Sequence, residues 1–224
     1  SSWSGDLFGP TRTPSRTGAR YGLHLIEHET HYEYFAGLRA KSDALREIET
    51  WHTTMTAAGA RPRVLTTDLG GEFVSKAADD LCSRLGLAQR FRAPESHVQD
   101  IESSHRRLFE SARPALIDSG APATLWEDVC TWVVDTHNCR HVGGAIPHVA
   151  LFSSFPDLSP LAPFYSHIAA YDGGQGRFAS RSVHARYIGP ARDCGIGAIR
   201  IIVNQHQRVV RTWRYLGAPG ATVD

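Results

Sequence analysis

The order of β-forming and helix-forming segments constrains the fold of this chain most. Three short β-type runs come first, joined by segments that contain the turn signals Gly9-Pro10 and Gly18. These runs are 3–8, 21–27 and 31–38. Because strands that follow one another through short connections pair antiparallel, we expect the sheet to begin as an antiparallel meander.

Helices and strands alternate in the next part of the chain. Apolar residues at helical spacing predict a helix from about Ser42, and the apolar segment 63–67 predicts a buried strand that ends just before Asp68. Ser75 is typical of a helix N-cap and Gly86 of a helix stop, so a second helix is expected between them, followed by a strand at 87–91. Strands separated by helices cross over and run parallel, so the sheet should be mixed.

Helices dominate the following segment. One is expected from Asp100, with Pro114 breaking or kinking it because proline removes a backbone donor. Another is expected over 124–139, and a proline-containing linker should follow, including 156–163. Strand candidates then recur at 185–188, 199–203 and 208–215.

This element order predicts an α/β protein with an RNase H-like mixed five-stranded sheet flanked by helices, followed by a small β-rich C-terminal unit. We expect the core at 1–150 and the linker with a small basic β-rich domain at 151–224. The 224 residues, 42% of them hydrophobic, suffice for one full core and a smaller second one.

Composition and charge indicate the cellular environment of the protein and its possible contacts. No run of 18 apolar residues could span a membrane. The first residues show no signal-peptide pattern and begin abruptly in a strand, which suggests a polyprotein fragment. The four cysteines form no CxxC pair, so reduced thiols in an intracellular protein are expected. Residues 1–150 have a net charge of −3 and residues 151–224 of +4, which suits phosphate contact by the tail, although ordinary surface charge explains it too.

Three carboxylates fall where α/β sheets place functional groups. Asp6 lies inside the first strand, Asp68 ends the fourth, and Glu102 lies in the first turn of a later helix. The first and fourth strands are central neighbours in an RNase H-like sheet, so these groups can converge. Converging carboxylates need compensation, and oxygen ligands favour Mg²⁺ or Mn²⁺. The alternative is coincidence, because the chain has 23 acidic residues.

Several segments, in order, resemble copia-type (Pseudoviridae-like) LTR retrotransposon integrases. Residues 66–73 resemble the family's "S-D-N-G-G-E-F", with Leu69 in place of Asn, and residues 6–10 resemble its "D-x-x-G-P". Residues 102–108 resemble "E-R-x-N-R-x-L", and residues 155–161 resemble "k-P-d-l-s-h-L". The resemblance covers nearly the whole chain.

The resemblance implies a D,D,E polynucleotidyl transferase. Asp6, Asp68 and Glu102 would be the catalytic residues and would bind two Mg²⁺ (or Mn²⁺) ions. Element DNA 3′ ends would then be joined to target DNA by metal-dependent phosphoryl transfer. The expected partners are element and target DNA and further copies of the chain, with no membrane, and the expected location is intracellular, nuclear at the time of integration. The family also has a zinc-binding module before the core, which we would expect upstream of residue 1.

The segment before Glu102 departs from the family. Only 33 residues separate Asp68 from Glu102, against about 35 in the family, and "P-Q-Q-N-G-V-A-E" has become residues 96–102 without the Asn-Gly pair. Asp100 adds negative charge and Ser103 replaces a basic residue. The alternatives are therefore a catalytically impaired or domesticated nucleic-acid- or protein-binding module, and a metal-dependent nuclease.

Basic residues are the candidate DNA contacts. Arg106 and Arg113 share the helix face of Glu102 and could contact phosphates, or simply form a solvated face. Arg186 and Arg211 belong to a tail in which basic and aromatic residues interleave, as in DNA-backbone binding, although the aromatics could equally fill a barrel core. His137 and His141 have helical metal-pair spacing, but without a companion Glu or third ligand we expect no zinc there.

Overall fold

The computed structural model describes residues 1–68, 70, 73–91, 99–171, 181–191, 194 and 197–217, without the side chains of residues 99 and 100. Its first half is a five-stranded mixed sheet in the order β3-β2-β1-β4-β5. The strands are β1 (Ser2–Phe8), β2 (Tyr21–Glu27), β3 (Glu33–Leu38), β4 (Val64–Thr67) and β5 (Ala88–Phe91). Strands β1, β2 and β3 pair antiparallel, whereas β1, β4 and β5 pair parallel. The predicted RNase H-like mixed sheet is confirmed.

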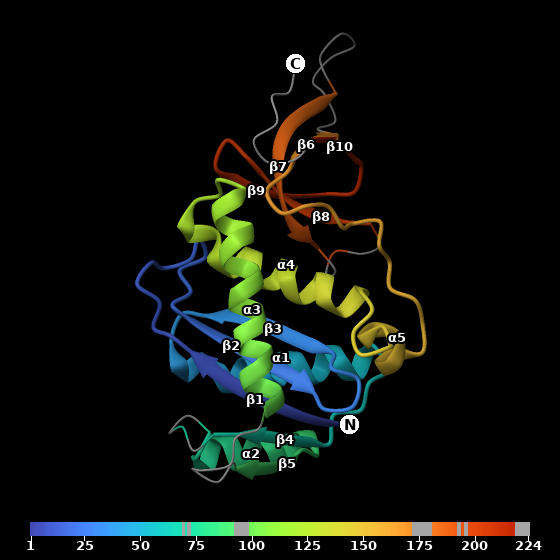
Figure 1. The fold of residues 1–224 in the computed structure, drawn as a ribbon. Coiled ribbons are helices and arrows are strands. Elements are labelled where there is room, and N and C mark those ends of the chain that lie inside the picture. The colour runs from blue at the N-terminus through green and yellow to red at the C-terminus, as the bar shows by residue number, and fades with distance from the viewer. Residues whose placement is uncertain are drawn as a thin grey trace.

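Helices cover both faces of this sheet (Figure 1). They are α1 (Ala44–Ala57), α2 (Lys76–Leu85), α3 (Gln99–Asp118) and α4 (Trp126–Cys139), with short 3₁₀ turns at Lys41–Asp43 and Ala123–Leu125. Helices α1 and α2 share a core with Trp3, Leu23 and Leu65, whereas α3 and α4 pack around Phe35 on the other face. Because side chains alternate along a strand, Ser4, Asp6 and Phe8 of β1 face α3, opposite to Trp3.

The helix ends follow their local chemistry. The Ser75 side chain accepts a hydrogen bond from the Ala78 N–H, and Gly86 ends α2 in the left-handed conformation with φ 68°, as predicted. Pro114, by contrast, lies inside an unbroken α3, so the predicted break is wrong. Leu108, Ala112 and Leu116 on both sides of Pro114 pack in the α3–α4 core, and this tertiary packing outweighs the lost hydrogen bond.

The second half is an all-antiparallel sheet in the order β10-β6-β7-β8-β9. It follows helix α5 (Pro147–Phe152), and its strands are β6 (His167–Tyr171), β7 (Ser182–Pro190), β8 (Ile199–Val203), β9 (His206–Val210) and β10 (Trp213–Gly217). The predicted β-rich unit is confirmed, with two corrections. The run 208–215 contains the end of one strand and most of another, and β6 was not predicted because His167–Tyr171 is short and carries two alanines.

The two halves share a core. Ile188 of β7 and Ile202 of β8 pack with Val129 and Val133 of α4, so α4 is sandwiched between both sheets (Figure 1). The predicted boundary at residue 150 stays a prediction. Within the described residues, no helix has the length and apolarity needed to cross a membrane.

Candidate active site

Asp6 lies in β1, and Asp68 directly follows the neighbouring strand β4. The parallel register pairs Ser2 with Val64 and Ser4 with Thr66, so each aspartate is two residues beyond the last equivalent pair. Leu65 of β4 packs in the α1–α2 core, and an alternation continued past Thr67 would direct Asp68, like Asp6, to the opposite face, which α3 crosses. The local peptide orients both carboxylates, because the Leu7 N–H donates to Asp6 Oδ1 (2.8 Å) and the Gly70 N–H to Asp68 Oδ1 (3.2 Å).

Glu102 lies in the first turns of α3 and is exposed, next to the fully buried Ile101. The residue of α3 that reaches Asp6 is His105, one turn further on, with Nδ1 3.6 Å from Asp6 Oδ2. The sequence placed Glu102 correctly on the helix.

The chemistry of the carboxylates suits a hard divalent cation, since all three predicted ligands offer oxygen atoms. In the parts of the chain that the structure describes, no three His, Cys, Asp or Glu side chains are gathered closely enough to hold an ion as they stand. Residues 92–98, which include most of the altered segment before Glu102, lie outside the described residues. The donor set therefore fits Mg²⁺ or Mn²⁺ by type.

A buried polar cluster lies beside the site, centred on Glu33, which is 1% exposed. Arg107 of α3 donates to Glu33 Oε1 and, through Nη1, to His137 Nδ1 (2.8 Å). His137 Nε2 donates to the His31 carbonyl (3.0 Å), which fixes its neutral tautomer. The Asn138 amide exchanges two 2.8 Å hydrogen bonds with the Glu33 backbone, and so closes the outer edge of β3.

His24 joins this cluster to the aspartate. It is fully buried, its Nε2 lies 3.4 Å from Glu33 Oε2, and its ring stacks on His105 with centroids 5.0 Å apart. Burial, and then the charge of Arg107, lower the pKa of His24 to about 3, and the same two causes lower the pKa of His137 to about 3. Both imidazoles are therefore neutral at neutral pH, and ring stacking between His105 and His24 links the Asp6 contact to the Glu33 cluster, without a hydrogen bond at either nitrogen of His24 within the described residues.

Sequence reasoning missed this cluster. Arg106 and Arg113, the predicted phosphate contacts, are both exposed on α3, whereas the unpredicted Arg107 holds the buried carboxylate. One residue in the sequence could have indicated the cluster. Glu33 is charged and lies at a strand position on the same α3–α4 face as Phe35. A buried charge there requires a partner, although its identity was not readable from the sequence.

The predicted tail contacts have partners within the chain. The Arg186 guanidinium lies 5.0 Å from the Tyr165 ring centroid and donates to the Tyr165 carbonyl (3.2 Å). Arg211, in the turn between β9 and β10, is exposed and donates to the Cys194 carbonyl (2.8 Å). These bonds orient both side chains, and their contact with DNA stays a prediction.

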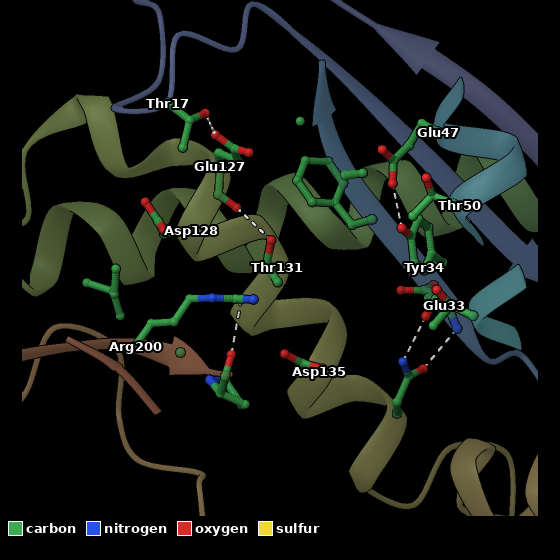
Figure 2. A pocket seen from close by; sticks show the side chains of 18 of the residues that line it. Thr17, Glu33, Tyr34, Glu47, Thr50, Glu127, Asp128, Thr131, Asp135 and Arg200 are labelled. Carbon is green, nitrogen blue, oxygen red and sulfur yellow. Dashed lines mark hydrogen bonds between the residues drawn. The ribbon is translucent and has the colours of Figure 1, made fainter. Parts of the chain in front are cut away.

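A separate cleft lies at the outer edge of β3 (Figure 2). It is lined by α1, β3, α4 and the second sheet, and most of its charged lining side chains are acidic, among them Glu47, Glu127 and Asp128. Burial raises the pKa of the Asp128 carboxyl to about 6, although Arg16 lies 3.2 Å away and opposes the shift. The cleft is two strands from β1 and shares no lining residue with the predicted triad, so it is not part of the candidate active site.

Comparison of the chain with known proteins agrees with the family resemblance that its sequence motifs indicate. No family model matches the chain. The chain is 23% identical over 124 residues, 54% of its length, to the "Retrovirus-related Pol polyprotein from transposon TNT 1-94" of Nicotiana tabacum, and the match spans 9% of that polyprotein. The catalytic core domain of BIV integrase superposes with a TM-score of 0.53 at 15% identity, covering 67% of this chain and 93% of that core. The predicted resemblance to copia-type retrotransposon polyproteins is confirmed, and the fold is that of an integrase catalytic core.

Proposed function

We propose that this chain is a retroelement integrase core that joins the 3′ ends of element DNA to target DNA. One observation carries the proposal. Asp6 lies in β1 and Asp68 directly follows β4, the parallel neighbour of β1, in the sheet over which the Glu102-bearing helix packs. The similarity to a retrotransposon polyprotein and the integrase-core fold support the same reading.

Each predicted residue has a role in this proposal. Asp6, Asp68 and Glu102 would hold two Mg²⁺ or Mn²⁺ ions, which would supply charge stabilisation for the attacking and leaving oxygens of an in-line phosphoryl transfer. The Leu7 N–H holds the Asp6 carboxylate in one orientation. Exposed Arg106 and Arg113 would contact DNA phosphates beside the centre, and Arg186 and Arg211 would contact DNA from the second sheet. Homo-oligomeric assembly and nuclear action during integration belong to the same proposal.

The test is a joining assay with labelled element-end DNA and a target duplex, in Mg²⁺ and in Mn²⁺. It compares the unmodified chain with Asp68→Asn and with Asp118→Asn, a matched change of an exposed aspartate at the far end of α3. We expect joined products that disappear in Asp68→Asn and persist in Asp118→Asn. Cleavage without joining would instead favour a metal-dependent nuclease.

A second candidate function rests on the altered segment before Glu102, with its shortened length and Ser103 in place of a basic residue. On that reading the chain is a catalytically impaired or domesticated module that binds nucleic acid or protein. DNA binding that neither metal ions nor Asp68→Asn changes, with no joined or cleaved product, would establish this reading over the first.

A further inference from the structure

His105 of α3 contacts Asp6, and its ring is held there by its neighbours. The ring stacks on His24 with centroids 5.0 Å apart and planes 13° apart, and it meets Phe8 edge-on at 6.0 Å. Its side chain is 15% exposed. This packing presents Nδ1 to the Asp6 carboxylate from one fixed direction.

The separation of the two groups suits a shared cation. His105 Nδ1 and Asp6 Oδ2 lie 3.6 Å apart, beyond the usual 2.7–3.2 Å of a hydrogen bond. Two ligand atoms on one tetrahedral ion, with bonds of about 2.1 Å, are roughly 3.4 Å apart. Asp6 Oδ1 accepts the Leu7 N–H, so Oδ2 is the oxygen that faces the imidazole.

The spacing along α3 adds a third donor. Glu102 and His105 are three residues apart, so they project from the same side of the helix. A Glu-x-x-His pair on one helix is the arrangement by which helices contribute a carboxylate and an imidazole to two-metal carboxylate sites. The family motif has Asn where this chain has His105, so the imidazole is a feature of this sequence.

We propose that His105 is a ligand of the carboxylate metal centre, through Nδ1, and that it shifts the preference of the centre from Mg²⁺ toward cations that accept nitrogen, such as Co²⁺ and Zn²⁺. The inference rests on the proposed function, since it assumes that Asp6 helps to hold a cation. Mg²⁺ takes oxygen ligands and retains its waters, whereas imidazole suits the later divalent transition metals. Replacing the family's asparagine by histidine therefore changes which ion the site holds best.

The experiment is calorimetric titration of the full chain with Mg²⁺, Co²⁺ and Zn²⁺. The variants are His105→Asn, which restores the family's residue, His105→Gln, and Asp6→Asn. His52→Asn on α1 is the matched control, and thermal unfolding verifies that each variant folds. We expect His105→Asn and His105→Gln to weaken Co²⁺ and Zn²⁺ binding about tenfold or more, on the scale of changes around a metal centre, with Mg²⁺ little affected. In ¹⁵N-histidine NMR, Zn²⁺ should shift an Nδ1 resonance that is missing in both variants.

The outcomes separate the two proposals. If the Co²⁺-to-Mg²⁺ affinity ratio is unchanged in the His105 variants while Asp6→Asn abolishes binding, His105 is not a ligand and the proposed centre stands. If His105→Asn tightens every cation, the imidazole competes with the metal for Asp6, and the inference is overturned. If the unmodified chain binds none of the three ions, the inference and the metal centre fail together.

Discussion

Arg107 should be the single side chain on which the buried polar cluster most depends. Arg107→Met keeps much of the side-chain volume but leaves the Glu33 carboxylate, 1% exposed, without a cation. The remaining neighbour of Glu33 Oε2 is His24 at 3.4 Å, which is neutral because its pKa is lowered to about 3. Removing one partner of a buried ion pair costs about 3–5 kcal/mol. Because the Arg107 side chain is 26% exposed, water can reach the gap, so we expect the lower end, about 3 kcal/mol.

The assay is urea unfolding at pH 7.5, followed by tryptophan fluorescence. Arg106→Met is the matched control: Arg106 is the exposed neighbour on the same helix, and its loss should change the free energy of unfolding by less than about 0.5 kcal/mol. Glu33→Gln combined with Arg107→Met should cost less than the two single changes added together, because the double variant buries no unpaired charge. A loss below about 1 kcal/mol for Arg107→Met, or a loss equal to that of Arg106→Met, would refute the assignment of this cluster.

Two further predictions concern pH and buried charge. The pKa values of His24 and His137 are lowered to about 3 each in the folded chain. The unfolded chain therefore binds protons that the folded chain excludes, and the free energy of unfolding should fall as the pH drops below about 6.5. At pH 5 the loss should be roughly 2 kcal/mol per histidine. Urea midpoints at pH 7.5 and 5.0 measure this, and equal midpoints would contradict it. The raised pKa of Asp128, about 6, means that its charge destabilises the fold above pH 6, so Asp128→Asn should raise the melting temperature at pH 7.5 and have little effect at pH 4. A lower melting temperature at pH 7.5 would show that the Arg16 ion pair outweighs the burial cost.

The sheet could be predicted from the sequence because its signals are local. The strand β2 has its predicted bounds, and Ser75 and Gly86 cap α2 as expected, since alternation and capping depend on residues a few positions apart. The helix break predicted at Pro114 was wrong because the prediction used a local rule, whereas long-range packing decides the conformation there. The α3–α4 core holds the residues on both sides of this proline in one helix.

The site was partly predictable for the same reason. Asp6 and Asp68 could be singled out because each lies at or next to a strand that local alternation predicts, whereas their pairing followed from the expected RNase H-like strand order, in which β1 and β4 are indeed neighbours. The Glu33–Arg107 and Arg107–His137 contacts join residues 74 and 30 positions apart. No periodicity encodes such contacts, which arise only when α3 and α4 are laid across β2 and β3. The same geometry puts His105 against Asp6.

Crystals grown or soaked with Mn²⁺ and measured at its absorption edge would test the central claim most directly, because anomalous scattering locates the ion without reference to activity. We predict anomalous peaks between the carboxylates of Asp6 and Asp68, within about 2.2 Å of an oxygen of each, with Glu102 drawn toward the ion. Mn²⁺ bound elsewhere on the chain, or no peak at these strand ends under saturating Mn²⁺, would contradict the assignment of this face as a polynucleotidyl transferase centre.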